Sequence, residues 1–126
     1  MSENRFDIED RLIDSSVRVI RVTEALPNTV AGNHIQKQLI RSGTSPAANY
    51  GEAQSAESKA DFIHKMKISL KELRESRVWL KIIDRAELLS SESLVAILDE
   101  SNQLISIFVT SIGTAKTNLQ AEKAGM

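Results

Sequence analysis

The residues whose chemistry could support binding or catalysis are gathered in the middle of the chain. A cation, two hydrogen-bonding groups and a carboxylate recur at i, i+4, i+8 and i+11, the spacing of one helix face: Arg41, Ser45, Asn49 and Glu52. A second polar set recurs at i, i+3 and i+7: Ser69, Glu72 and Ser76. We predict that the two sets pair across a helical bundle as a structural polar layer that fixes helix register. The alternatives are a polar pocket for binding or catalysis, and plain exposure to solvent.

A ridge of basic side chains could bind phosphate. Its members lie at i, i+4, i+7, i+14 and i+18: Lys67, Lys71, Arg74, Lys81 and Arg85. Val78 interrupts this basic ridge, and Lys59 would extend it by a turn. The ridge is either a solvated face, partly neutralised by Glu75 and Asp84, or a surface that contacts the phosphates of RNA or DNA. No aromatic residue is interleaved to stack on bases, so we expect such contact to be weak, salt-dependent and mostly with the backbone.

The sequence lacks the residue patterns of common enzyme sites. The two histidines, His34 and His64, fall on different predicted helices, and the Asp61–His64 pair at i, i+3 has no second pair to complete a metal site. There is no cysteine, no GxSxG motif and no Gly-rich phosphate loop. We therefore predict a protein that is not an enzyme and that holds no metal and no cofactor.

Composition favours a helical protein of the cytoplasm. Hydrophobic residues make up 41% of the 126 residues but aromatic residues only 4%, so the core must be built from aliphatic side chains that suit helix packing. The charged N-terminus has no apolar signal segment, and no apolar run reaches the roughly 20 residues of a membrane span. The absence of cysteine fits a reducing compartment. We expect a single cytoplasmic domain with no membrane contact.

Charge is distributed unevenly, although the whole chain carries a net charge of only −1. Residues 27–86 carry ten Lys and Arg against six Asp and Glu, whereas residues 1–26 and 87–126 are both net acidic. A basic middle suits a polyanion, and acidic ends suit a basic protein. Two candidate functions follow: association with RNA or DNA through the basic ridge, and a protein-interaction scaffold whose partner is a nucleic-acid enzyme.

Apolar residues at helical spacing predict four helices, at 7–26, 33–56, 58–87 and 91–121. Residues suited to N-caps stand at or near each start: Asp7, Asn33, Ser58 with Asp61 at capping-box spacing, and Ser90 or Ser91. Amphipathic helices joined by short connections predict an all-α fold. We expect an antiparallel up-down-up-down four-helix bundle over residues 1–126.

Pro46 leaves two interpretations of the second helix. Ser45 and Pro46 could cap and start a new helix, or the helix could run through with a kink because Pro46 cannot donate to the carbonyl of Ser42. Small residues around the proline would let another helix approach closely: Ser42, Gly43, Ala47 and Ala48. Such an approach favours a packed helix here.

One segment resembles a known family. It reads QLIRSGTSPAANYGEAQSAESKADFIHKMKISLKELRESRVWL, from Gln38 to Leu80. The matching features are Arg41-Ser42, Ser45-Pro46, Ala48-Asn49 with Glu52, Ser58 with Phe62, and the run from Leu70 to Glu75. They resemble the pattern of the 23S rRNA intervening-sequence proteins of bacteria. The chain departs from that pattern at Ala53, where the family often has glycine.

The resemblance implies a four-helix bundle with a continuous, kinked second helix, assembled as a ring-shaped homopentamer. The accessory protein of diversity-generating retroelements, which works with a reverse transcriptase, is similar in fold and assembly. In a ring the basic ridge would be repeated, so weak contacts with RNA or DNA would gain avidity. The small-residue face of the second helix would then pack between subunits.

Overall fold

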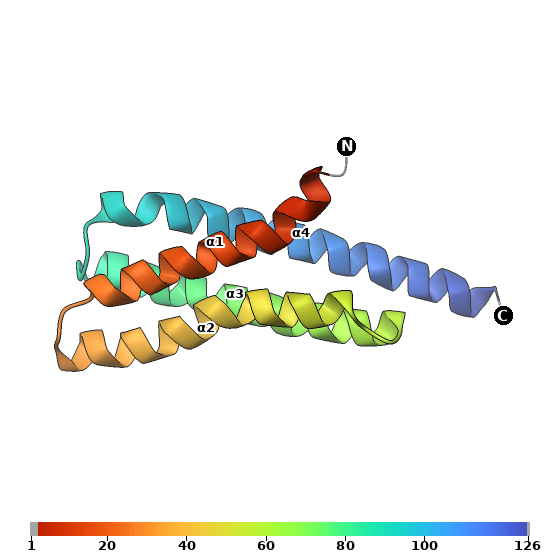
Figure 1. The fold of residues 1–126 in the computed structure, drawn as a ribbon, viewed down its shortest axis with the longest axis horizontal. Coiled ribbons are helices and arrows are strands. Elements are labelled where there is room, and N and C mark those ends of the chain that lie inside the picture. Colours follow the sequence, from red (N-terminus) through yellow and green to blue (C-terminus); the bar gives the residue numbers. More distant parts are fainter. Residues whose placement is uncertain (1–2, 126) are drawn as a thin grey trace.

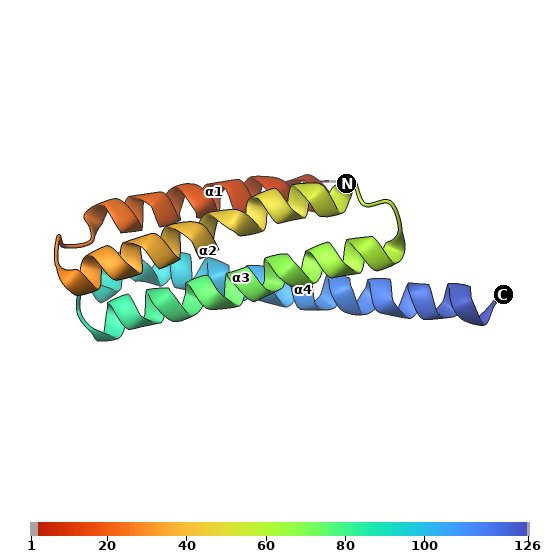
Figure 2. The same ribbon diagram turned by 90° about the horizontal axis from the view of Figure 1, so that it is seen from below.

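A computed structural model describes residues 3–125 of the protein, with side chains from residue 8 onward, and these residues form four helices. They are α1 (Glu3–Ala25), α2 (Val30–Gln54), α3 (Lys59–Arg85) and α4 (Ser91–Ala124). The described residues contain no strand. Figures 1 and 2 show the four helices lying alongside one another, with short connections at alternate ends of the molecule. The predicted all-α, four-helix fold is confirmed.

The starts of the first two helices differ from the predictions. α1 begins at Glu3, so Asp7 lies inside the helix and the predicted N-cap there is wrong. α2 is capped by Thr29, whose side chain accepts a hydrogen bond from Gly32 N at 3.0 Å, so the predicted cap at Asn33 is also wrong. Asn33 instead donates from its side chain to that of Asn28 at 3.1 Å.

Gly32 explains why the start of α2 was missed. Glycine weakens a helix, so the sequence around it resembles a connection. In the structure a Cβ at Gly32 would lie 2.0 Å from the carbonyl oxygen of Pro27. The glycine is therefore required where the α1–α2 connection passes close to the first turn of α2.

The caps of the last two helices agree with the predictions. Ser58 accepts a hydrogen bond from Asp61 N at 3.0 Å, and the Asp61 carboxylate accepts one from Glu57 N at 3.3 Å. Ser90 caps α4 by accepting from Ser93 N at 3.3 Å. These side chains satisfy amide groups that have no partner within their helices.

α2 runs continuously from Val30 to Gln54 with Pro46 inside it, which rules out a new helix starting at Ser45. Three hydroxyl groups in the turn before the proline donate to carbonyl oxygens four residues earlier: those of Ser42, Thr44 and Ser45, at 2.6 to 3.0 Å. Bonds of this kind from serine and threonine hydroxyls often accompany a bend in a helix.

The core consists of two aliphatic-rich clusters separated by small residues. The first contains Leu12, Tyr50, Ala53, Ile63, Met66, Leu73, Leu104, Ile105, Phe108 and Ile112. The second contains Val19, Ile35, Leu39, Leu80, Ile83, Leu94 and Ile97. Between members of the two clusters, α2, α3 and α4 each place a buried serine: Ser42, Ser76 and Ser101. Of these three serines, the spacing of polar residues predicted only Ser76 as a member of a polar layer.

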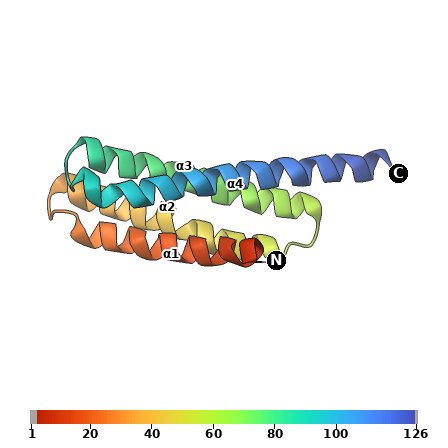
Figure 3. The ribbon, with the colours of Figure 1, turned by 90° about the horizontal axis from the view of Figure 1, so that it is seen from above.

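Contacts between the helices are uneven. α2 packs extensively on α1 and on α3, and α3 packs on α4, whereas α1 and α4 contact each other least. Figure 1 shows α1 and α4 crossing at an angle, and Figure 3 shows them diverging from the end that holds the α1–α2 connection. The Arg11 guanidinium of α1 donates two hydrogen bonds to the Glu100 carboxylate of α4 at 2.7 and 2.8 Å. This ion pair joins the most sparsely packed seam.

Gly43 brings α1 close to α2. A Cβ at this position would lie 2.6 Å from Cγ1 of Val19. Ser42 and Gly43 are both buried within the protein. These two small residues are therefore covered by the chain itself, and only Ala48 of the predicted small-residue set is exposed.

The C-terminal turns of α4 project past the α2–α3 connection (Figures 1 and 2). Glu122 on these turns forms an ion pair with Lys59 at the start of α3. Within residues 3–125, no helix combines the length and apolar character needed to cross a bilayer.

Candidate nucleic-acid interface

The solvent-facing side of α3 carries the basic ridge. Between residues 64 and 85 the exposed side chains of this helix are His64, Lys67, Ile68, Lys71, Arg74, Val78, Lys81, Ile82 and Arg85. Five of these are the ridge cations, and none is acidic. At a rise of 1.5 Å per residue, the ridge runs for about 27 Å along the helix. Ser58 fixes the start of α3, and the burial of its apolar residues leaves the ridge residues facing outward.

The ridge cations are not neutralised by the rest of the described chain. Within residues 8–125, none of the five forms an ion pair or a side-chain hydrogen bond. The two carboxylates expected to neutralise them are engaged elsewhere, since Asp84 accepts from Ser91 Oγ at 2.6 Å and Glu75 contacts α2. Lys59, which was expected to extend the ridge, pairs with Glu122.

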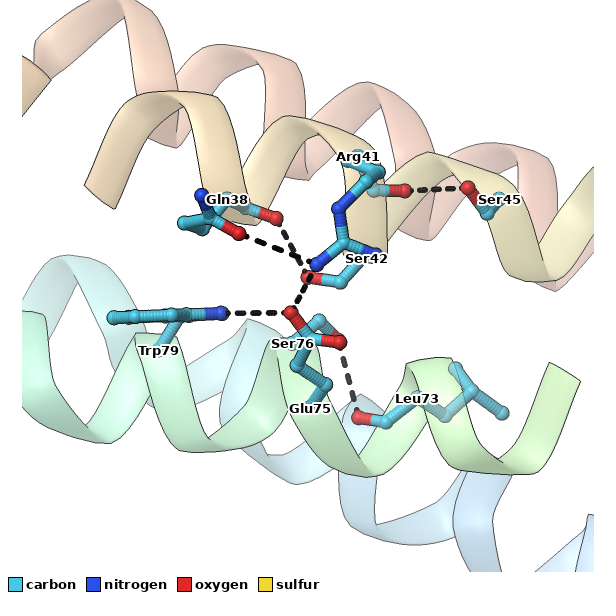
Figure 4. A network of polar contacts seen from close by, with 8 residues as sticks. All are labelled: Gln38, Arg41, Ser42, Ser45, Leu73, Glu75, Ser76 and Trp79. Carbon is cyan, nitrogen blue, oxygen red and sulfur yellow. Dashed lines mark hydrogen bonds and ion pairs between the residues drawn. The ribbon is translucent and has the colours of Figure 1, made fainter. Parts of the chain in front are cut away.

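Glu75 is the centre of a polar network between α2 and α3 (Figure 4). Its Oε2 accepts a hydrogen bond from the Arg41 guanidinium and another from Trp79 Nε1 at 3.1 Å. Arg41 also donates to Gln38 Oε1 at 3.3 Å. The His34 ring packs edge-on against Trp79, with ring centroids 5.8 Å apart. The spacing of polar residues predicted Arg41 in a polar layer but did not indicate Glu75 as its partner.

Two other predicted polar contacts join α2 to α3. Asn49 Nδ2 donates to Glu72 Oε1 at 2.6 Å. The fully buried Ser69 donates to the carbonyl oxygen of Pro46 at 2.9 Å. With Arg41–Glu75, these contacts connect the middle parts of α2 and α3.

The remaining members of the predicted polar layer do not cross between helices. Ser45 donates to the carbonyl of Arg41 in its own helix at 2.6 Å, and Ser76 to that of Leu73 at 3.1 Å. Glu52 is exposed and has no ion-pair or hydrogen-bond partner among the described side chains. The seven residues are therefore split between contacts across the seam, contacts within one helix, and solvent.

The histidines do not come together. His34 packs on Trp79 at the α2–α3 seam, and His64 is exposed on α3. Asp61 interacts with Lys65 at 3.4 Å rather than with His64. Among the residues that the structure describes, no three His, Asp or Glu side chains are arranged to hold a metal ion.

The polar contacts between α2 and α3, here called the polar seam, and the basic ridge both lie in the part of the chain that matches a known family. The model of the 23S rRNA-intervening sequence protein family matches residues 5–110. The chain belongs to this family. The match spans α1, α2, α3 and the N-terminal part of α4, so it contains every ridge cation. It also confirms the resemblance drawn from residues 38–80.

One solved structure supports the same assignment. It is a protein of unknown function from the S23 ribosomal protein family of Bacteroides thetaiotaomicron, 34% identical to this chain with a TM-score of 0.78. The similarity covers 83% of this chain and 97% of the Bacteroides chain. A search of curated proteins finds no match.

Proposed function

We propose that this member of the 23S rRNA-intervening sequence protein family is a non-enzymatic, self-assembling bundle that associates with RNA or DNA through the basic ridge of α3. The observation that carries the proposal is the unpaired state of Lys67, Lys71, Arg74, Lys81 and Arg85 on a face with no exposed carboxylate. Exposed cations without ion-pair partners can bind phosphates with release of counterions, and few intramolecular contacts are lost when they do so. The name of the family, which refers to a segment of ribosomal RNA, fits this partner.

The non-enzymatic part of the proposal is supported by the state of the polar seam. Arg41 and Asn49, two members of the alternative catalytic set, are held by the carboxylates of Glu75 and Glu72. Contacts of this kind set the positions of α2 and α3. These groups therefore have a structural role, and no catalytic role is needed to explain their spacing.

The binding proposal can be tested by fluorescence anisotropy with labelled fragments of ribosomal RNA at low salt. Charge reversal of two ridge residues, in the double variant K71E/R74E, should lower affinity at least tenfold because it removes two cations and adds two anions to the surface. The double variant K37E/K123E is the matched control, since it changes net charge equally at exposed positions outside the ridge. Absence of binding by the wild-type protein, or equal loss in both variants, would refute the proposal.

For the assembly we infer an antiparallel up-down-up-down bundle that forms a ring-shaped homopentamer. The connections at alternate ends in Figures 1 to 3 support the antiparallel order. A line of small and apolar residues on α2, at i, i+4, i+7 and i+11, supports packing between subunits: the exposed Ile40 and the half-buried Thr44, Ala47 and Gly51. Light scattering coupled to size-exclusion chromatography should give five times the 14.0 kDa of one chain. A monomer mass would contradict the assembly and its avidity.

A scaffold for a protein partner is the second candidate function. Val95 on α4 is 63% exposed, and Glu92 and Asp99 lie on the same helix face at three and four residues away. An apolar side chain between two carboxylates suits a basic protein such as a nucleic-acid enzyme. A pulldown with the wild-type protein that recovers only nucleic acid would count against this candidate.

A further inference from the structure

The C-terminal part of α4 adds a surface that the family match does not include. The match ends at residue 110, whereas α4 continues to Ala124. The Bacteroides structure is matched over 97% of its own length and covers 83% of this chain. A binding site formed by these additional turns would give this chain a function beyond the one proposed for the basic ridge.

Such a site is present where the additional turns pack on α3. A groove of about 240 Å³ lies between the two helices, here called the α3–α4 groove, and its lining consists of Lys67, Leu70, Val109, Ile112, Gly113 and Lys116. Leu70 and Ile112 form an apolar floor that is continuous with the first core cluster. Val109 at the wall remains 46% exposed.

Two lysines stand at the rim of this floor. Lys67 and Lys116 are both exposed, and neither has an ion-pair partner among the described side chains. Lys59, which lines a different groove against the same turns of α4, is already neutralised by Glu122. The α3–α4 groove therefore combines an apolar floor with uncompensated positive charge, a combination that attracts carboxylates carried next to aliphatic groups.

Gly113 leaves the backbone of α4 open on the side that lines this groove. Glycine inside a helix is unfavourable relative to alanine, so its presence calls for a reason. At Gly43 the reason is the close approach of Val19, but a Cβ at Gly113 would meet no atom within 4 Å. The chain itself does not need glycine here, and its absence of a side chain keeps the backbone open to a close neighbour.

We propose that the α3–α4 groove docks an acidic amphipathic segment of a partner protein, with an aliphatic side chain over Gly113 and carboxylates at Lys67 and Lys116. The aliphatic floor disfavours nucleic acid, because it offers neither a stacking surface nor hydrogen-bonding groups for bases. The site is separate from the ridge function and shares only Lys67 with it.

A displayed library of random 16-residue peptides, selected on the full-length protein and depleted on the K116E variant, tests this proposal. The enriched peptides should carry an aliphatic residue flanked by Asp or Glu. A fluorescein-labelled enriched peptide should then lose at least tenfold in affinity, measured by anisotropy, for K116E and separately for G113L. The K123E variant is the matched control, because it reverses one charge on the same turns outside the groove, and it should bind as the wild type does.

Three results would overturn the proposal. The first is an enriched pool without the acidic-aliphatic pattern, or with equal affinity for K116E. The second is a K116E protein that loses RNA binding, because the groove would then belong to the nucleic-acid surface. The third is a changed mass of the K116E protein in light scattering, because the occupant of the α3–α4 groove would then be a second copy of this chain. The ridge variant K71E/R74E should still bind the peptide. Nucleic-acid binding by the ridge and peptide binding by the groove can therefore fail independently of each other.

Discussion

The two sides of α3 are both rich in charge, but the charges are in different states. On the side that faces α2, Glu72 and Glu75 each hold a donor from that helix, Asn49 and Arg41. On the side that faces solvent, the cations of the basic ridge meet no carboxylate among the described residues. Paired charges position helices, whereas unpaired charges on one face are available to a partner. A surface that positions helices therefore differs from a binding surface in whether its charged side chains are paired, and not in the density of charge along the sequence.

The largest effect on stability is expected when two glycines are replaced by alanine, one on a packed helix surface and one on an open helix surface. Gly43→Ala should lower the free energy of unfolding by about 1–3 kcal/mol, because its Cβ would overlap Val19 and push α1 away. Gly113→Ala should raise it by up to about 1 kcal/mol, because the new Cβ enters open space on a helix. Denaturant unfolding at one protein concentration measures both, and equal signs would contradict the packing described for α1 and α2.

Two charge reversals compare the two sides of α3: one at Arg41 of α2, which pairs with Glu75 on the inner side, and one at Arg74 on the solvent side. Arg41→Glu should cost about 1 kcal/mol of stability, because it removes the pair with Glu75 and adds a repulsion, and should leave RNA binding unchanged. Arg74→Glu should change stability by less than about 0.5 kcal/mol and weaken RNA binding by about tenfold. Thermal unfolding and anisotropy on the same samples test the pair of expectations. If both variants lost the same property, the two sides would not differ in function.

A smaller effect is expected at the buried contact between α2 and α3. Ser69→Ala should cost about 1 kcal/mol, because it removes the only hydroxyl donor to the Pro46 carbonyl in the described structure. Ser106→Ala, at an exposed position of α4, is the control and should have no measurable effect. Denaturant midpoints of the two variants would be compared. Equal midpoints would show that the buried hydrogen bond does not stabilise the seam.

The smallest effect concerns Tyr50, the single tyrosine of the chain. Burial, together with the nearby Glu9 carboxylate, raises the pKa of its phenol above the ordinary value of 10.0. Because the folded state resists ionisation, the unfolded state releases its proton first as pH rises above about 10, and stability falls through that range. Absorbance titration of the phenolate should give a pKa above that of the urea-unfolded protein. An equal or lower pKa would contradict the burial of Tyr50.

The sequence predicted the four helices because helical periodicity is a local property. The stripe through Phe62, Met66 and Leu73 and the ridge at Lys71 and Arg74 could both be recognised without knowing what α3 packs against. Starts of helices were less predictable where glycine is present for a tertiary reason, as at Gly32.

Pairing across helices could not be derived from the sequence, because it depends on how two helices are rotated and staggered relative to each other. Asn49 and Glu72 were both placed in the polar layer by their spacing, and they pair with each other. Arg41 was placed in the same layer, but its partner is Glu75, which lay outside that spacing. The α3–α4 groove was missed for the same reason, since its two rim lysines lie far apart in the sequence.

The salt dependence of RNA binding tests the central claim, that the unpaired cations of α3 contact phosphates, most directly. If all five ridge cations contact a single strand, the logarithm of the affinity should fall against the logarithm of salt concentration with a slope of up to about −3.5 per subunit. K71E/R74E should reduce that slope by about 1.4 or more, and K37E/K123E should leave it unchanged. A wild-type slope near zero, or a slope that K71E/R74E does not alter, would contradict the account.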